Sequence, residues 1–263
     1  MTVKSKPVVN IEDLFRSAEE EGVISPQSLQ ALTVVDLGAE IQAGLGAGVD
    51  DVQASEVVLV TMMPDDSGSI RFAGNAQAVR DGHNQVLEAL RKSKQGDGVL
   101  VHTRYLNGDV LYPYCVLDRA VTMTTKNYDP CRGTPLYDQS MVLLGTVLAK
   151  AQELSQAGVA VRTVTLLITD GADECSVRAS AKEVRTLVND MMRAESHVVA
   201  AMGIDGGGLD FRTVFRSMGI EDRWILTPKS DPREIRRAFQ VFSQSVASAS
   251  RGGAPPGLGG FVN

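Results

Sequence analysis

The sequence contains no apolar run that approaches the length needed to cross a membrane. It also lacks an excess of basic residues, since 26 Lys and Arg stand against 32 Asp and Glu and the formal net charge is −6. Proteins that bind nucleic acid usually carry a positive surface, so this class of partner is not expected. Residues 1–10 lack the apolar segment of a signal peptide. We therefore expect a cytoplasmic protein that binds neither nucleic acid nor membrane.

Cysteine and histidine are scarce, with three residues of each type. The cysteines are Cys115, Cys131 and Cys175, an odd number without CxxC spacing. Such a set indicates neither a disulfide framework nor a zinc site, so we expect free thiols. The histidines lie far apart in the sequence, and His83 falls on the apolar face of a predicted helix. That position indicates a histidine at the edge of the core.

The composition is that of a globular protein, because 43% of the 263 residues are hydrophobic and 22% are charged. Residues 1–53 form a predicted helical extension. Its first helix ends at Gly22, and its second runs from Pro26 to about Leu45. We expect these helices to pack on the main domain, with masking of a site or docking of a partner as the alternative. The segment 249–263 is rich in Gly and Pro and predicts a flexible tail.

Strands and helices alternate from residue 54 to residue 248, which we interpret as one domain. Asn107-Gly108-Asp109 indicates a tight hairpin, so the two strands around it run antiparallel. Alternation elsewhere is typical of a mostly parallel sheet covered on both faces. We therefore predict a doubly wound, Rossmann-like α/β fold with six strands, one of them an antiparallel edge strand, and helices on both faces. The predicted strands are 57–63, 99–106, 110–117, 161–169, 197–202 and 223–226, and the predicted helices are 75–94, 135–156, 178–194, 209–218 and one that begins at Pro232.

Polar side chains follow the first predicted strand, in the motif Asp65-x-Ser67-x-Ser69. Two further loops carry Thr134 and Asp170, the latter directly after a predicted strand. Because sites of open α/β sheets lie at the carboxyl ends of the strands, we expect these five side chains to converge. Carboxylate and hydroxyl oxygens suit a hard cation such as Mg²⁺. For the first motif taken alone, a turn that caps the next helix is the alternative.

These five residues resemble the metal-ion-dependent adhesion site (MIDAS) of von Willebrand factor type A (vWA) domains. That family has Asp-x-Ser-x-Ser after its first strand, Thr in a later loop and Asp after its fourth strand. The resemblance covers roughly residues 54–248 and includes the hairpin. It implies that Mg²⁺, with Mn²⁺ or Ca²⁺ as alternatives, is held by Asp65, Ser67, Ser69, Thr134 and Asp170. It also implies that one open coordination position takes an Asp or Glu of a protein partner.

Two segments are most similar to those of bacterial intracellular members of the vWA family. Residues 133–138 read Gly-Thr-Pro-Leu-Tyr-Asp, and residues 168–173 read Ile-Thr-Asp-Gly-Ala-Asp. The segment 239–246 is similar to the ending of tellurite-resistance-associated members. The resemblance therefore implies a bacterial, cytoplasmic protein of that type.

We interpret the chain as a non-enzymatic module for metal-dependent protein–protein interaction. One alternative is a Mg²⁺-dependent phosphoryl-transfer enzyme of the haloacid dehalogenase type, which also has an Asp after its first strand. Such enzymes need a second acid two residues after that Asp, and Ser67 occupies the position. The other alternative is a structural subunit in which the metal only holds the loops together. Asp173, Glu174 and Asp205 either rim the metal or are ordinary solvated acids.

Overall fold

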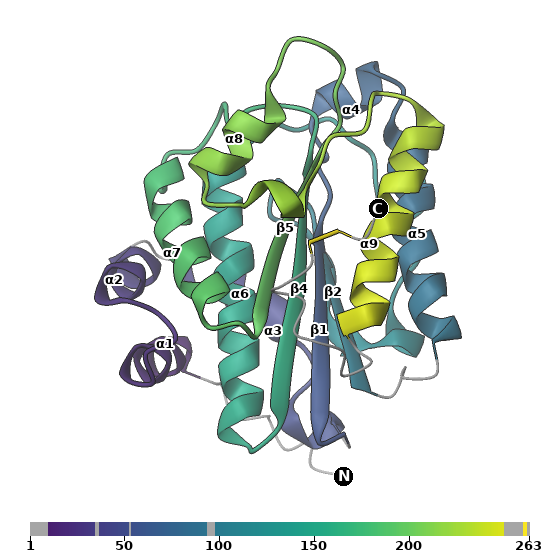
Figure 1. The fold of residues 1–263 in the computed structure, drawn as a ribbon. Helices are drawn as coiled ribbons and strands as arrows, with labels where there is room; N and C mark the ends of the chain where they lie inside the picture. Colours follow the sequence, from purple (N-terminus) through teal and green to yellow (C-terminus); the bar gives the residue numbers. More distant parts are fainter. Residues whose placement is uncertain (1–9, 35–36, 53, 94–97, 250–259, 262–263) are drawn as a thin grey trace.

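A six-stranded sheet runs through the molecule in the computed structural model, which describes residues 10–34, 37–52, 54–93, 98–249 and 260–261 (Figure 1). The strands are β1 (Glu56–Met63), β2 (Val99–Arg104), β3 (Val110–Val116), β4 (Ala160–Thr169), β5 (His197–Gly203) and β6 (Ile225–Leu226). Their order is β3-β2-β1-β4-β5-β6, and among these strands only the edge strand β3 is antiparallel to its neighbour. This arrangement confirms the predicted sheet.

The strand β1 lies in the middle of the sheet because its apolar, β-branched sequence is suited to burial on both faces. Every residue of β1 except the first is buried. Val60 of β1 lies opposite Val101 of β2 on one side and opposite Val164 of β4 on the other, both in parallel register. Parallel pairing brings the carboxyl ends of β1, β2, β4 and β5 to the same end of the sheet. The candidate site residues lie at that end.

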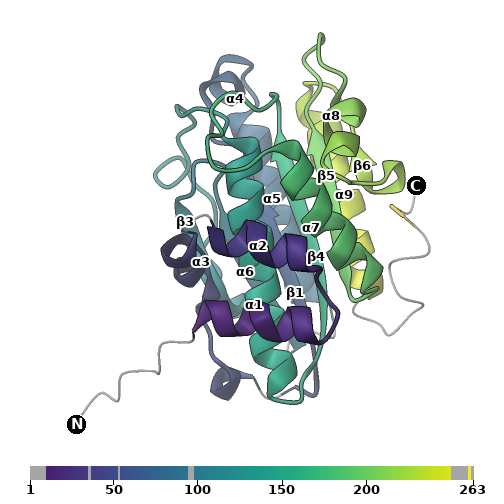
Figure 2. The ribbon, with the colours of Figure 1, turned by 90° about the vertical axis from the view of Figure 1, so that its left-hand side faces the viewer.

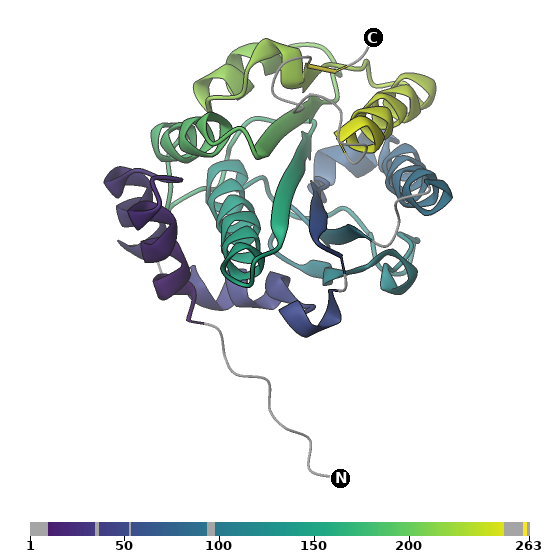
Figure 3. The same cartoon turned by 60° about the horizontal axis from the view of Figure 1, so that its bottom comes forward.

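Helices cover both faces of the sheet, as predicted (Figures 1 and 3). They are α4 (Gly68–Phe72), α5 (Ala76–Lys92), α6 (Leu136–Gln156), α7 (Ala181–Arg193), α8 (Phe211–Ser217) and α9 (Pro232–Ala249). The helices α5 and α9 pack against each other on one face, and α6, α7 and α8 lie on the other. The close approach of α5 to α9 depends on Gly82, because a Cβ there would lie 2.0 Å from the Phe239 ring. His83 is buried in the core.

The amino-terminal extension packs on the main domain, as expected (Figure 2). Its helices are α1 (Ile11–Glu20), α2 (Pro26–Val34) and α3 (Gly38–Leu45). The helices α1 and α3 contact α6, whereas α2 contacts α7, and buried residues such as Phe15 and Ile41 belong to the same apolar core as the sheet. The prediction of one continuous helix from Pro26 to Leu45 is wrong, because α2 and α3 pack on different neighbours. The domain boundary at residue 53 stays a prediction.

Near each of the two outer strands, β3 and β6, a segment from outside the sheet makes a backbone hydrogen bond. At β3, the backbone N–H of Ala47 donates to the Tyr114 carbonyl oxygen at 2.7 Å. Near β6, the backbone N–H of Phe261 donates to the Arg223 carbonyl oxygen at 3.0 Å, and the Phe261 ring packs edge-on against Trp224. Phe261 therefore packs, although it belongs to the predicted flexible tail, most of which lies outside the described residues.

None of the described helices combines the length with the apolarity that crossing a lipid bilayer would require.

Candidate metal centre

Three loops meet at the end of the sheet where the central strands β1 and β4 stop. They are the first loop, 64–67, which leads into the first turn of α4, the end of the second loop, 120–135, and the third loop, 170–180. Backbone hydrogen bonds join the first two loops, because Gly68 N–H donates to the Arg132 carbonyl at 3.0 Å and Arg132 N–H donates to the Asp66 carbonyl at 3.1 Å. The third loop joins the second where Glu174 N–H donates to the Thr134 carbonyl at 3.0 Å. The three loops therefore form one connected unit.

Three of the five predicted residues lie within a single chain of hydrogen bonds. Ser67 is the N-cap residue of α4, and Ser69 lies in the first turn of that helix. Their hydroxyl oxygens are 2.8 Å apart, and Ser69 Oγ donates to Asp170 Oδ1 at 2.6 Å. Side chains that are about a hundred residues apart in sequence thus converge, because β1 and β4 are parallel neighbours in the sheet.

Asp65 is fully buried beside this chain of hydrogen bonds and is held by both neighbouring loops. Its Oδ1 accepts from Ser67 N–H at 2.7 Å. Its Oδ2 accepts from Thr169 Oγ at 2.7 Å and from Asp170 N–H at 3.4 Å. Thr169 was not among the predicted residues, although a hydroxyl directly before Asp170 was a signal that could have identified it. The Tyr128 hydroxyl also donates to the Asp65 carbonyl oxygen, which fixes the backbone at this point.

Thr134 is buried and lies against the third loop. Its Oγ1 is 3.8 Å from the position that a Cβ on Gly171 would take, so the hydroxyl lies next to the residue that follows Asp170. Thr134 lies just before α6, which begins at Leu136. The structure therefore brings the fifth predicted residue to the same end of the sheet, on the side of Asp170.

A further residue, Asp138 in the first turn of α6, holds the third loop in place. Its carboxylate is buried and accepts from the backbone N–H groups of Val177, Arg178 and Ala179 at 3.0, 2.9 and 2.7 Å. In return, the Ser176 hydroxyl accepts from Asp138 N–H at 3.0 Å. Asp138 was part of a quoted motif but not a predicted site residue, and its place in the first helical turn was the available signal.

Asp173 has a structural role in the same loop. Its Oδ1 accepts from the backbone N–H of Tyr137 at 3.2 Å and from the Ser176 hydroxyl. The first of these bonds lies at the amino-terminal end of α6, where unpaired N–H groups favour a carboxylate, and the second lies within the third loop. Asp173 is therefore more than an ordinary solvated acid.

Three carboxylates lie close together at this end of the sheet, of which Asp65 and Asp66 are buried and Asp170 is partly buried. Burial, together with the negative charge of Asp65, raises the pKa of Asp170 to about 6. Burial also raises the pKa of Asp65, and it raises that of Asp66 to about 7, to which the charges of Asp65 and Asp109 contribute. In the part of the chain that the structure describes, no Lys or Arg forms an ion pair with Asp65, Asp66 or Asp170. A cation among these groups would stabilise their ionised forms.

The donor set fits a hard divalent cation. Among the described residues there is no group of three or more His, Cys, Asp or Glu placed to hold a metal. The centre instead offers two carboxylates and three hydroxyls, all of them oxygen donors of the kind that Mg²⁺, Mn²⁺ and Ca²⁺ accept. Soft metals that need thiolate ligands are not suited to it, even though Cys131 and Cys175 are exposed free thiols on the surrounding loops.

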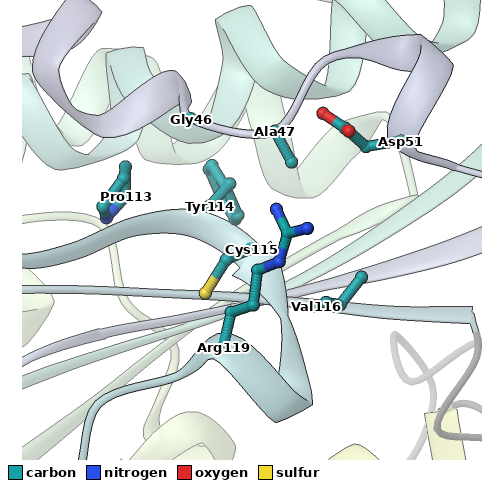
Figure 4. Close-up of a pocket in the computed structure, with 8 residues that line it drawn as sticks. All are labelled: Gly46, Ala47, Asp51, Pro113, Tyr114, Cys115, Val116 and Arg119. Carbon is teal, nitrogen blue, oxygen red and sulfur yellow. The ribbon is translucent and has the colours of Figure 1, made fainter.

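A pocket of about 440 Å³ lies at the opposite end of the sheet (Figure 4). Its walls come from the segment 46–51 of the extension and from the carboxyl end of β3, where Val116 pairs with Leu100 near the start of β2. The side chains of Asp51 and Arg119 enter it from facing walls. Because the metal centre lies at the carboxyl ends of β1 and β4, this pocket is not part of it.

Several solved structures resemble this chain at low sequence identity. Proximal thread matrix protein 1 (PTMP1) from the mussel byssus is 15% identical, with a TM-score of 0.50 over 73% of this chain and 48% of that chain. The pilus adhesin SpaC from Lactobacillus rhamnosus GG, in an open conformation, is 14% identical, with a TM-score of 0.54 over 75% of this chain and 31% of that chain. A von Willebrand factor type A protein from Catenulispora acidiphila is 16% identical, with a TM-score of 0.48 over 74% of this chain and 43% of that chain.

The similarity to PTMP1 and SpaC is a similarity of fold. This chain spans about half the length of PTMP1 and about a third of SpaC. No protein-family model matches the sequence, and no curated protein matches it.

Proposed function

We propose that the chain is a metal-dependent protein-interaction module of the vWA type, whose MIDAS consists of Asp65, Ser67, Ser69, Thr134 and Asp170. The observation that carries the proposal is the hydrogen-bonded group Ser67–Ser69–Asp170 beside the buried Asp65, at the carboxyl ends of two parallel strands. A bound Mg²⁺ supplies a coordination position for one oxygen of a partner's Asp or Glu. Mn²⁺ and Ca²⁺ accept the same type of donor.

The residues of the centre contribute to metal binding in different ways. Both oxygens of Asp65 accept hydrogen bonds from the protein, which orients this carboxylate and provides negative charge at a fixed place. The Ser67 and Ser69 hydroxyls then provide neutral oxygen donors, and Thr134 provides a third from the second loop. Neutral donors offset less of the positive charge of a cation than carboxylates do. The site therefore keeps an attraction for one more carboxylate, that of the partner.

An interaction module explains the centre better than an enzyme does. A phosphoryl-transfer enzyme of the alternative type needs a second acid where Ser67 stands, and the Ser67 hydroxyl is hydrogen-bonded to Ser69. We therefore propose that the chain is not an enzyme. The cytoplasmic location, the bacterial origin and the tellurite-resistance type stay predictions from the sequence.

The test is calorimetry of the full chain with Mg²⁺, followed by capture of partners with and without EDTA. We expect one Mg²⁺ site that is lost in Asp65→Ala and kept in the control Asp81→Ala, which removes a half-exposed carboxylate on α5. Partner capture should require the metal and should fail for Asp65→Ala. Absence of Mg²⁺ binding at millimolar concentration would contradict the metal site. Capture that is unchanged by EDTA would contradict the metal-dependent interaction and favour the structural-subunit alternative.

A further inference from the structure

Large apolar side chains are almost all buried in the described part of the chain, so the exceptions carry information. Three of them are exposed, namely Phe72, Val121 and Val177. Phe72 and Val177 are each 90% exposed, whereas Val121 is 44% exposed. The first two belong to the elements that form the metal centre. A single exposed apolar residue needs no explanation, so the position of each of these residues relative to the metal centre decides what it indicates.

Phe72 lies beside the serine pair of the centre. It is the last residue of α4, the short helix that Ser67 caps, and its ring approaches the start of that helix. The ring Cε2 is 3.4 Å from the position that a Cβ on Gly68 would take. The backbone around it is fixed, because Ala73 N–H donates to the Ser69 carbonyl at 2.8 Å. The ring therefore has a defined place next to the hydroxyl donors.

Val177 occupies a comparable place on the third loop, which carries Asp170. Its own N–H donates to the buried Asp138 carboxylate at 3.0 Å, and the next two residues of the loop donate to the same group. Cys175, two residues earlier, packs its sulfur against Gly133, next to Thr134. The exposed valine is therefore presented by an ordered loop on the Thr134 side of the centre.

Both apolar side chains lie at the same end of the molecule. Figures 1 and 2 show α4 and the loop between β4 and α7 together at the end of the sheet where β1 and β4 stop. Val121 is different, because it follows the turn after β3, and the antiparallel β3 ends at the opposite end of the sheet. Val121 is therefore a control at an exposed apolar side chain that lies away from the centre, although it is less exposed than the other two.

We propose that Phe72 and Val177 contact apolar side chains that flank the metal-binding carboxylate of the partner. The partner segment is then an Asp or Glu with large apolar residues a few positions away on each side. This inference rests on the proposed function, which supplies the carboxylate. It adds selectivity, because acidic residues are common on protein surfaces and a metal alone does not distinguish among them. Burial of one such side chain at an interface strengthens binding by about tenfold or more.

The test uses two displayed libraries of seven-residue peptides, one with a central Asp and one with a central Asn, and random flanking residues. Selection on the full chain in Mg²⁺ should enrich the Asp library, and the enriched flanks should be large and apolar. A synthetic peptide from that selection should bind Phe72→Ser and Val177→Ser at least tenfold more weakly than wild type. Val121→Ser should bind it like wild type. Thermal melting of each variant checks that all three remain folded, as their exposure leads us to expect.

The outcomes separate this inference from the proposed function. Enrichment of Asp peptides with polar flanks would overturn the inference and leave the function intact. Wild-type affinity of both Phe72→Ser and Val177→Ser for the selected peptide would do the same. If the Asp library has no advantage over the Asn library, or if the advantage persists in EDTA, the proposed function fails and the inference fails with it.

Discussion

Replacing Asp138 by Ala should loosen the third loop and lower the stability of the whole chain. The Asp138 carboxylate is buried, and three backbone N–H groups of the loop depend on it. Its Oδ1 accepts from Arg178 and Ala179, and its Oδ2 accepts from Val177. Removing the acceptor leaves all three donors to find water or to remain unpaired.

The magnitude follows from these bonds. A hydrogen bond contributes about 1 kcal/mol net, and more where the acceptor is charged, so the loss of three corresponds to about 3 kcal/mol or more. For a chain of this size, about 3 kcal/mol lowers the melting temperature by about 6–12 °C. Asp138→Asn keeps one oxygen for two of the donors but places an NH₂ group against the third. We expect that variant to lose about half as much.

Differential scanning calorimetry measures the melting temperatures, with Asp129→Ala as the control. Asp129 is an exposed acid of the second loop that pairs with Arg71 at 3.5 Å, so its removal should change little. Because Asp170 lies in the loop that Asp138 holds, Mg²⁺ affinity should follow the same order, with wild type above Asp138→Asn and Asp138→Ala lowest. The reasoning is refuted if Asp138→Ala melts within about 2 °C of wild type, or if Asp138→Asn is as unstable as Asp138→Ala.

Three further predictions concern the centre and the core. Thr134→Ala should weaken Mg²⁺ binding modestly but weaken partner binding by about 30- to 4,000-fold, since a truncated contact at a buried charge costs about 2–5 kcal/mol. Calorimetry measures both affinities, and wild-type affinity for the partner would contradict the MIDAS mechanism. Burial raises the pKa values of Asp66 and Asp170 to about 7 and about 6, so the folded chain binds more protons than the unfolded chain between those values and about 4. The melting temperature in EDTA should therefore fall as the pH rises through this window, and Asp66→Asn should flatten the slope; a rising profile would show that these pKa values are not raised. Gly82→Ala would place a Cβ 2.0 Å from a buried aromatic ring and should lower the free energy of unfolding by about 1–3 kcal/mol, as measured in urea. Gly206→Ala has no atom within 4 Å of its new Cβ and should lower it little. Equal losses of stability in the two variants would argue against the close packing of α5 on α9.

Much of the fold could be predicted because its signals are local. The strand β1 is a continuous apolar run, and such a run between polar segments predicts a buried strand. The hairpin between β2 and β3 could be read from Asn107-Gly108-Asp109, and Gly108 indeed has a φ of 101°, in the region that favours glycine. The convergence of the five candidate ligands could be expected for the same reason, because each stands near the end of a strand or the start of a helix, whereas their binding of a metal stays a prediction.

The remaining features depend on partners that are distant in sequence. Asp138 binds backbone N–H groups 39 to 41 residues further along the chain, and Arg178 pairs with Glu40 of α3, 138 residues earlier. Such contacts leave no periodic pattern in the sequence. The break between α2 and α3 has the same origin, because it is set by the surfaces of α6 and α7 on which the two helices pack.

The contacts at the two lateral edges of the sheet occupy backbone groups that a further strand could otherwise use. An edge strand with unpaired backbone groups is a template on which another chain can add a strand, which leads to open-ended assembly. A second copy that paired with β3 at Tyr114 would first have to displace Ala47 from its carbonyl oxygen, and one that paired beside Arg223 would have to displace Phe261. The extension and Phe261 therefore each occupy one backbone carbonyl oxygen at or near a lateral edge of the sheet, and such contacts oppose the addition of a further strand there.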